Sequence, residues 1–316
     1  MSTVSIVLAT YNGERFIKEQ LDTIKNQSIT PNEVIIGDDR SSDNTVQIVD
    51  KYIKSGQLSD NWHFVVNKTN KGYAKNFIDL ALMASGDYIF FSDQDDIWDL
   101  RKIERMSGIL DENPDISLLC SNLEPFYYEE GARKWDKKDL DAMTNNGNIE
   151  KPIYNYFNFF CQRSGCTMCI RKDYLHAIES YWTLNWAHDD FVWKMAMLDG
   201  KCAIYQHCFL KRRMHANNAS SMKIRTREWR KEQIKAQLAQ YQSYLTYAGK
   251  NKASDKKLEI IRKNENCAKL RIHLLEKGNP LLWFRLLNQF RNCYPRRQAI
   301  ILDLYLTIFS QYKGVN

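Results

Sequence analysis

The stretch GDYIFFSDQDDIW, residues 86–98, joins an apolar strand to a cluster of carboxylates. Its first half, YIFF, is typical of a strand that is buried on both faces of a parallel sheet. Asp93 and Asp95 follow where the chain should leave the sheet, and two carboxylates at this spacing can reach one divalent cation. Such a cation keeps coordination positions open for phosphate oxygens, so the stretch predicts a site for a diphosphate-bearing substrate. The alternative is a surface turn with capping aspartates.

The residues upstream of this stretch alternate between strand and helix patterns. Strands are predicted over residues 4–9, 33–39 and 63–67, and helices over residues 14–27, 41–56 and 73–84. This order is typical of a parallel sheet with helices on both faces. Ligands of such sheets lie beyond the carboxyl ends of the strands. We therefore expect three polar segments to converge there: Thr10-Tyr11-Asn12, Asp38-Asp39 and Asp93-Gln94-Asp95-Asp96.

The composition is that of a folded protein with a substantial core. At 316 residues and 44% hydrophobic, the chain excludes global disorder. The longest apolar stretches fall short of the roughly 20 residues that a membrane-spanning helix needs, and the N-terminus lacks a basic leader, so we expect a cytoplasmic protein.

The eight cysteines of the chain are expected to be reduced thiols. Cys166 and Cys169 favour a buried strand over the alternative of a zinc site.

The positive charge is concentrated toward the C-terminus. The net charge is +7, yet the residues from Lys250 onward carry 14 Lys and Arg against 5 Asp and Glu, which leaves −2 for the first 249 residues. Helical patterns over 225–248 and 256–277 precede an amphipathic basic segment that begins at Asn279. The predicted units are residues 1–222 and a helical region over 223–316. Basic residues interleaved with Trp, Phe and Leu favour an anionic membrane surface as partner. A packed hairpin or a homo-oligomer interface is the alternative, and no nucleic-acid-binding motif accompanies the tail.

Five further segments accompany the opening stretch: SIVLATYNGERFIKEQLDTIKNQ (5–27), EVIIGDDRSSDNT (33–45), NKGYAKNF (70–77), SGCTM (164–168) and WAHDDFVWKMAMLDGK (186–201). Together they resemble the family 2 glycosyltransferases of the GT-A fold, in particular a bacterial polysaccharide branch that contains rhamnosyltransferases. The resemblance extends over roughly residues 3–220. It implies an α/β GT-A fold with a mainly parallel central sheet, to which the helical patterns after residue 222 add a C-terminal helical region. It also implies inverting transfer of a sugar from a nucleoside diphosphate, with Mn²⁺ or Mg²⁺ as cofactor.

The resemblance assigns the first loops to the nucleotide. Thr10, Tyr11 and Asn12 match the segment that lines the nucleobase and ribose pocket, and Asp38 would accept a hydrogen bond from the pyrimidine N–H. Asp39 matches the second acid of this pair, with Arg40 in the place of the usual glycine. The segment that packs near the nucleotide matches Asn70, Gly72 and Asn76, with Lys75 as a phosphate contact.

The same resemblance assigns the metal to the acidic cluster. Asp93 and Asp95 match the D-x-D motif, with Asp95 as the direct ligand, and Asp96 would brace the loop or meet the sugar. FLKRRMHANNAS, residues 209–220, resembles a Y-R-x-H-x-x-N segment that closes over the diphosphate in the wider fold. The matching positions are Arg213, His215 and Asn218, with Arg212 in the place of the tyrosine. His215 would complete the metal shell or contact phosphate; an ordinary surface histidine is the alternative.

The catalytic base is assigned to the segment HDDF. Inverting transfer needs one carboxylate to take the proton from the acceptor hydroxyl. In the family this base is the acid of an E-D or H-D pair, which matches His188 and Asp189 here. Asp190 is the competing candidate. For either aspartate, the alternative is a structural role as the N-cap of the following helix.

The donor and acceptor stay open at this level. The donor is dTDP-rhamnose or a UDP-linked galactose, glucose or N-acetylhexosamine, because donor choice depends on a few pocket contacts. The acceptor is a hydroxyl of a bacterial polysaccharide or of an undecaprenyl-linked oligosaccharide, which would place the enzyme peripherally on the inner face of the cell membrane. A non-catalytic nucleotide-sugar-binding scaffold is the alternative from another class, although such a protein would need no base.

Overall fold

Strands and helices alternate through the first part of the chain. The computed structural model describes residues 2–130, 132, 134, 135, 137–215, 224–309 and 311–313. The first elements are β1 (Val4–Thr10), α1 (Ile17–Lys25), β2 (Glu33–Asp38), α2 (Thr45–Ser55), β3 (Trp62–Val66), α3 (Tyr73–Met83) and β4 (Tyr88–Ser92). The strands pair in parallel in the order β3-β2-β1-β4. The alternation predicted from the sequence is confirmed, with β1, β2 and β4 almost wholly buried because helices cover both faces of the sheet.

The second part of the chain extends this sheet with mixed pairing. Its strands are β5 (Ile97–Trp98), β6 (Leu118–Tyr127), β7 (Ile149–Glu150), β8 (Met168–Arg171) and β9 (Cys202–Met214). Its helices are α4 (Lys102–Glu112), α5 (Lys137–Asp141), α6 (Lys172–Ile178) and α7 (His188–Asp199), with short 3-10 turns at Gly165–Thr167 and Glu179–Tyr181. The strand β8 lies between β4 and β6 and runs antiparallel to both. The sheet order is β3-β2-β1-β4-β8-β6-β9-β5, with β7 on β9.

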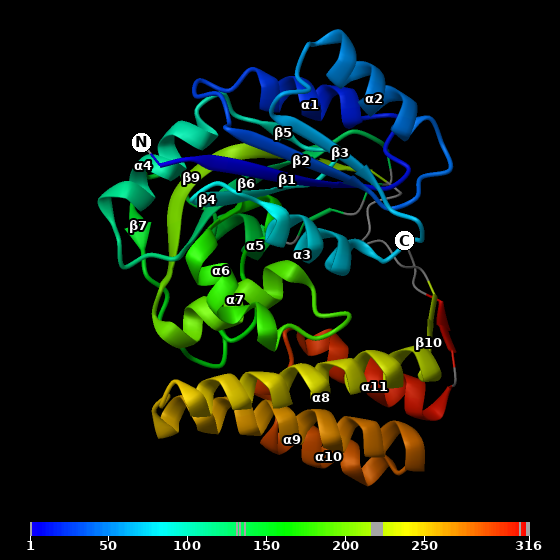
Figure 1. Cartoon of the computed structure of the whole chain (residues 1–316). Coiled ribbons are helices and arrows are strands. Elements are labelled where there is room, and N and C mark those ends of the chain that lie inside the picture. The colour runs from blue at the N-terminus through cyan, green and yellow to red at the C-terminus, as the bar shows by residue number, and fades with distance from the viewer. Residues whose placement is uncertain are drawn as a thin grey trace.

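Helices cover the two faces of the sheet unequally. In Figure 1, α1 and α2 lie above the sheet, and α3, α6 and α7 lie below it. The upper core is closed by α1, α2 and α4, and it includes Cys166 and Cys169. Both are buried as expected, but only Cys169 lies on a strand, β8, whereas Cys166 lies in the preceding 3-10 turn. The lower core continues from α3 and α7 into the C-terminal helices. The fold class predicted from the sequence, an α/β sheet with an appended helical region, is confirmed.

The C-terminal helices form a further layer beneath α6 and α7 (Figure 1). The elements are β10 (Ile224–Thr226), α8 (Arg227–Lys250), α9 (Asp255–Lys277), α10 (Pro280–Gln289), a 3-10 turn (Arg291–Cys293), α11 (Arg297–Ile308) and β11 (Gln311–Lys313). Within the layer, the buried Asp303 on α11 accepts hydrogen bonds at 2.7 Å from Arg230 on α8 and from Arg271 on α9. Opposite charges buried together tie the three helices, because losing one partner would leave an uncompensated charge.

The C-terminal layer shares its core with the sheet domain. Ile234, Tyr241 and Tyr244 of α8 are buried in the same hydrophobic cluster as Phe191 and Met195 of α7. The division of the chain after residue 222 therefore stays a prediction from sequence, while the packing joins the two parts. One physical consequence is that the C-terminal helices contact the elements that carry the candidate site.

Candidate active site

The ends of β1 and β4 lie side by side, and Gln94 joins their loops. The two strands pair with Leu8 opposite Ser92. The Gln94 side chain accepts hydrogen bonds from the Thr10 hydroxyl at 2.6 Å and from the Tyr11 N–H at 2.8 Å, and it donates to the Tyr11 carbonyl at 3.1 Å. The sequence marked Gln94 only as the residue between two acids. In the structure it fixes the predicted nucleotide loop, residues 10–12, against residues 93–96 after β4, which we call the acid loop.

Asn12 and Asp38 shape the turn that follows β2. Asn12 accepts a hydrogen bond from the Ser42 N–H at 2.8 Å, and the buried Asp38 carboxylate accepts from the N–H and the hydroxyl of Ser41 at 2.8 and 2.5 Å. Arg40 has φ +66°, in the left-handed region that favours glycine. The turn that the resemblance expects at a glycine is therefore made here by an arginine. The contacts of Asn12 and Asp38 with a nucleobase stay predictions.

Asp39 and Asn76 hold the loop that follows β3. Asp39 accepts hydrogen bonds from the backbone N–H groups of Lys71 and Gly72, both at 2.8 Å, and from the side-chain amide of Asn67 at 3.0 Å. Asn76 accepts a second hydrogen bond from Asn67 at 3.0 Å. Both residues are buried, so in this structure they support the predicted nucleotide segment from behind.

Two more residues of this segment make local contacts. Asn70 accepts a hydrogen bond from the Gly72 N–H at 3.0 Å. Lys75 forms an ion pair with Asp79 one helical turn along α3, and its ammonium lies 5.9 Å from the ring centroid of Trp182. The Lys75 side chain is 38% exposed and its ion pair is at the surface, so it can exchange Asp79 for a phosphate at small cost. A phosphate contact stays a prediction.

Asp95, His215 and Arg213 tie the acid loop to the end of β9. The Nε2 atom of His215 lies 2.8 Å from the Oδ2 atom of Asp95. Arg213 donates to the Asp95 carbonyl at 3.1 Å, pairs with Glu19 at 2.5 Å and lies over the ring of Phe16. Arg213 is buried, so it positions the loop in this structure, and its predicted contact with the donor stays a prediction. Asp95 and His215 meet as a carboxylate and imidazole pair, two ligand types that hold divalent metal ions.

A second group of metal-ligand atoms lies on the same loop. One ligand atom each of Asp93, Asp96 and Cys166 lies within 4.8 Å of the others. Burial raises the pKa of Asp93, against the positive charge of Arg212, and raises the pKa of Asp96 to about 8. In the part of the chain that the structure describes, neither carboxylate oxygen of Asp96 has a hydrogen-bond partner. A buried carboxylate without a partner is costly, so the residues present fit a divalent cation on this loop.

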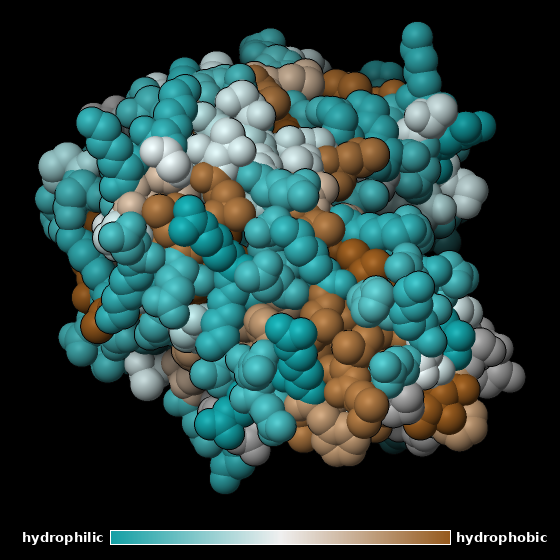
Figure 2. All heavy atoms as spheres, turned by 90° about the horizontal axis from the view of Figure 1, so that it is seen from below, coloured by the Kyte–Doolittle hydropathy of each residue, from teal (hydrophilic) through white to brown (hydrophobic). Residues whose placement is uncertain are grey.

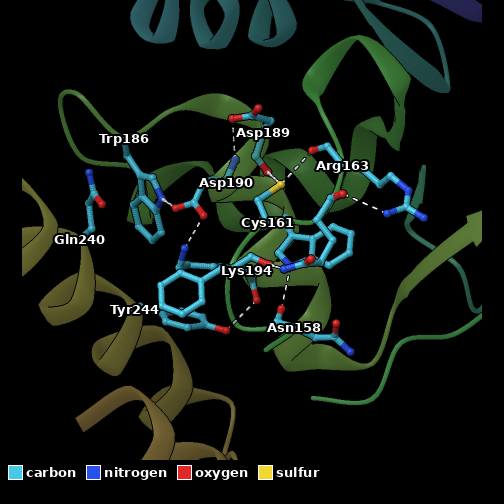
Figure 3. Close-up of polar contacts among 12 residues, drawn as sticks. Asn158, Cys161, Arg163, Trp186, Asp189, Asp190, Lys194, Gln240 and Tyr244 are labelled. Carbon is cyan, nitrogen blue, oxygen red and sulfur yellow. Dashed lines mark hydrogen bonds and ion pairs between the residues drawn. The ribbon is translucent and has the colours of Figure 1, made fainter. Parts of the chain in front are cut away.

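Two aspartates with different surroundings begin α7 (Figure 3). Asp190 accepts a hydrogen bond from the indole N–H of Trp186 at 2.8 Å and forms an ion pair with Lys194. Asp189 accepts a hydrogen bond from the backbone N–H of Asp190 at 2.8 Å. Burial, followed by the negative charge of Asp190, raises the pKa of Asp189. A carboxylate with a raised pKa is the better proton acceptor of the two, because Lys194 already neutralises Asp190.

His188 lies where α7 meets the acid loop. Its ring centroid lies 4.0 Å from that of Phe77 and 4.9 Å from that of Phe91, and burial lowers its pKa to about 4. Among the described residues, neither ring nitrogen has a hydrogen-bond partner. A Cβ atom at Gly165 would lie 2.2 Å from the His188 Nε2 atom, so only a glycine leaves room for the imidazole. The Sγ atom of the neighbouring Cys166 lies within 4.8 Å of ligand atoms of Asp93 and Asp96, so the start of α7 lies close to the acid loop.

The structure brings most of the predicted residues to one edge of the sheet. The end of β9 contacts the acid loop through His215 and Asp95, and the start of α7 lies near the same loop through Gly165 and Cys166. The Thr10-Tyr11 loop joins them through Gln94. Arg212, which has no predicted role beyond its place in the segment 209–220, donates to the Ser164 hydroxyl at 2.6 Å. Burial lowers the pKa of Arg212, but the groups around it, Cys166 and Asp93 first, raise the pKa above its usual value. Asn218 lies outside the described residues.

Comparison with known proteins assigns the fold and the family. The dTDP-rhamnosyl transferase RfbG of Shigella flexneri is 34% identical over 171 residues, which cover 53% of this chain and 55% of that relative. Residues 1–349 of Staphylococcus aureus TarS, in a crystal complex with UDP-GlcNAc, give a TM-score of 0.64 at 18% identity over 97% of this chain and 81% of that one. The mannosyltransferase PcManGT of Pyrobaculum calidifontis, solved with GDP-Man and Mn²⁺, gives 0.54 at 14% identity over 98% and 87%.

The family match covers the loops that are predicted to bind the nucleotide and the acid loop, but it ends before the start of α7. A sequence model described as glycosyl transferase family 2 matches residues 5–176, which is more than half of the chain. The chain spans about half the length of its Shigella relative, so that protein's whole activity does not transfer with the match. The matched residues include each strand end from β1 to β4 and the GCTM segment described above. The chain therefore belongs to glycosyl transferase family 2.

Proposed function

We propose that the protein is an inverting, metal-dependent glycosyltransferase that acts on a bacterial polysaccharide or on a lipid-linked oligosaccharide. One observation carries the proposal: two acidic sites with different chemistry lie close together, because Gly165 packs against His188 and the next residue, Cys166, lies beside Asp93 and Asp96. The acid loop after β4 holds the Asp95 and His215 pair. Close to this loop, the start of α7 presents Asp189, a partly exposed carboxylate with a raised pKa. The first site suits a metal-bound diphosphate, and the second suits removal of a proton.

The proposed reaction is a single displacement at the anomeric carbon of the donor. Asp189 takes the proton of the acceptor hydroxyl while the acceptor oxygen forms a bond to that carbon. The bond to the nucleoside diphosphate breaks on the opposite side, and the diphosphate leaves with the electron pair, so the configuration inverts. Asp93, Asp95 and His215 would hold Mn²⁺ or Mg²⁺, which when bound offsets charge on the departing diphosphate. The guanidinium of Arg212 adds a second positive charge near the same acids.

The donor that we favour is dTDP-rhamnose. Likeness to the Shigella dTDP-rhamnosyl transferase over 171 residues supports it. A UDP-linked hexose is the alternative, since TarS, which shares the fold, was solved with UDP-GlcNAc. A nucleotide-sugar-binding scaffold is disfavoured because it would have no use for a carboxylate with the surroundings of Asp189.

A calorimetric titration tests this proposal. The protein is titrated with UDP, dTDP, dTDP-rhamnose, UDP-glucose, UDP-galactose and UDP-N-acetylglucosamine, each with and without Mn²⁺. We expect one conjugate to bind tightly only with the metal, and the same conjugate to release its nucleoside diphosphate on incubation. Metal-dependent binding without release, even with undecaprenyl-linked acceptors present, would favour the scaffold. Failure of every conjugate to bind would overturn the proposed function.

We also propose that the C-terminal layer binds an anionic membrane surface. The helices α10 and α11 expose large apolar side chains, and Figure 2 shows an apolar area on the face that these helices form. The exposed residues are Leu281, Phe284, Leu287, Ile301, Ile308 and Phe309. Arg285, Arg291 and Arg296 are exposed on the same segment, which complements an anionic lipid surface. Among the described residues, no helix combines the length and apolar composition needed to cross a bilayer.

This surface would place the enzyme peripherally on the inner face of the cell membrane. A lipid-linked acceptor lies at that surface, so docking would bring the site near its substrate. A second copy of the chain is the alternative occupant of the apolar face. Vesicle binding and sedimentation equilibrium of Phe284→Asp distinguish a membrane from a second copy of the chain.

A further inference from the structure

The C-terminal helix α8 contacts the helix that carries the candidate base. The hydroxyl of Tyr244 on α8 donates a hydrogen bond to the backbone carbonyl of Lys194 on α7 at 2.7 Å, and both groups are buried. The Tyr244 ring is fully buried in the core that the two helices share. Figure 3 shows Tyr244 and Gln240 on α8 facing the first turns of α7. The C-terminal layer therefore touches α7 one turn beyond its two aspartates.

Lys194 continues this contact toward the site. Its side chain is only 5% exposed, its ammonium forms an ion pair with Asp190, and it lies 5.1 Å from the ring centroid of Phe159. Trp186 holds the other carboxylate oxygen of Asp190. A buried lysine with one carboxylate partner is strongly held, because separating the two would leave both charges uncompensated in a poorly solvated place.

The last link reaches the base itself. The backbone N–H of Asp190 donates to the Oδ1 atom of Asp189 at 2.8 Å. A shift of the Asp190 backbone would therefore move a hydrogen bond that the Asp189 carboxylate accepts. Three polar contacts thus connect α8 with the base, and they are joined to one another through the covalent structure of Lys194 and of Asp190.

We propose that Tyr244 and Lys194 are positioning residues of the transferase, through which the C-terminal layer fixes the first turn of α7 and the direction of the Asp189 carboxylate. The inference rests on the proposed function, which gives Asp189 its role. It goes beyond that function because it makes the C-terminal layer part of the catalytic unit and not only a surface for docking. Neither residue touches the reacting atoms, and both act through Asp190.

The same two helices offer a matched control at their other end. Tyr247, three residues after Tyr244 on α8, donates its hydroxyl to Asp199, the last residue of α7, at 2.5 Å. Tyr247→Phe and Tyr244→Phe each remove one hydroxyl between α8 and α7. Only Tyr244→Phe removes it near the base, so the pair separates positioning of the base from general packing of the helices.

The experiment compares Tyr244→Phe, Lys194→Met and Lys194→Arg with Tyr247→Phe in the full chain. Turnover is measured as nucleoside diphosphate released from the conjugates named above with Mn²⁺. Hydrogen exchange is measured for peptides that cover residues 186–192, and the melting temperature checks folding. We expect Lys194→Met to lower kcat by about a hundredfold and Tyr244→Phe by about tenfold, with donor KM within about twofold. Lys194→Arg should restore most of the turnover, and Tyr247→Phe should leave it unchanged.

Exchange in the first turn of α7 supplies a readout that does not depend on turnover. It should be faster in Tyr244→Phe and Lys194→Met than in Tyr247→Phe. Equal kcat in Tyr244→Phe and Tyr247→Phe, or unchanged exchange in Lys194→Met, would overturn the positioning role. If the wild-type protein releases nucleoside diphosphate from none of the conjugates, the proposed function fails, while the exchange data still decide whether α8 orders this turn.

Discussion

The two halves of the candidate site differ in how their buried polar groups are satisfied. In the half formed by the loops after β2 and β3, Asp38, Asp39 and Asn76 each have protein hydrogen-bond partners. In the half formed by the acid loop and the start of α7, Asp96 and His188 are buried and have no hydrogen-bond partner in the described part of the chain. Satisfied groups hold a loop in shape, whereas unsatisfied ones cost free energy that a bound ligand can recover.

Within one site, this difference separates the residues that hold the loops in shape from the residues that are available to a ligand. The first half is complete without a ligand, so changes there should act mainly on stability. The second half leaves polar groups ready for a cation or a sugar, so changes there should act mainly on binding and turnover. The predictions below are ordered from the largest expected effect to the smallest.

Removing the carboxylate of Asp189 should have the largest effect. Asp189→Asn keeps the size of the side chain and its hydrogen bond from Asp190, but an amide cannot take a proton. We expect turnover to fall by about a thousandfold, with the donor Kd within about twofold. Asp190→Asn is the control, with an expected loss of about tenfold because it disturbs only the orientation of the base. Equal losses of turnover in the two variants would remove the distinction between them.

Low pH should lower the stability of the protein, because the buried His188 of the second half is not protonated in the folded state. The pKa of His188 is about 4 in the folded protein, against about 6.5 for an exposed histidine. Between these values the unfolded chain binds a proton that the folded protein does not, so stability falls as the pH drops from 6.5 to 4, by up to about 3 kcal/mol. Urea unfolding of His188→Gln should show a flatter pH dependence. His63→Gln, at an exposed position on β3, should keep the wild-type dependence, and identical curves for the two variants would contradict the account.

A matched pair of amide substitutions compares the two halves directly. Asp39→Asn replaces an acceptor of three hydrogen bonds, so the free energy of unfolding should fall by about 2 kcal/mol. Asp96→Asn removes a buried carboxylate that has no hydrogen-bond partner among the described residues, so stability should stay within about 0.5 kcal/mol or rise, while turnover falls. Urea unfolding at neutral pH without metal measures both. Comparable destabilisation by the two substitutions would show that the halves do not differ.

The smallest effect concerns the apolar face of α10 and α11. Phe284→Asp should weaken binding to phosphatidylglycerol vesicles by about tenfold, because the aromatic side chain no longer enters the lipid interface. Leu100→Asp, at a similarly exposed position beside α4, should bind like the wild-type protein. Sedimentation equilibrium accompanies the vesicle assay. A dimer that Phe284→Asp dissociates, with no vesicle binding, would show that the face is covered by a second copy.

Much of the fold could be predicted from the sequence because each strand from β1 to β4 is a short apolar run between helical patterns. The return of β8 between β4 and β6 could not, because its four residues carry no signal of direction. The shared core of α7 and α8 was also missed. Tyr241 and Tyr244 look amphipathic in sequence, and only the packing shows that both are buried.

The sequence predicted the acidic residues of the candidate site but not all of the residues that contact them. Acids that follow apolar strands are readable from the chain, and the resemblance placed Asp95 and His215 in one metal site, although they lie 120 residues apart. The partners of these acids depend on three-dimensional packing, so Gln94 and Arg212 were not assigned. Gly165 was quoted only as part of a loop, and its closeness to His188 explains in physical terms why a glycine stands there.

The most direct test of the central claim compares Asp95→Asn with Asp39→Asn in a thermal-shift titration with Mn²⁺ and the conjugate that the wild-type protein binds. Asp95 belongs to the half that leaves groups for a ligand, and Asp39 belongs to the half that supports it. We predict that Mn²⁺ and the conjugate together raise the melting temperature of the wild-type protein and of Asp39→Asn, but not that of Asp95→Asn. An equal rise in Asp95→Asn would contradict a metal-dependent transferase site on this loop.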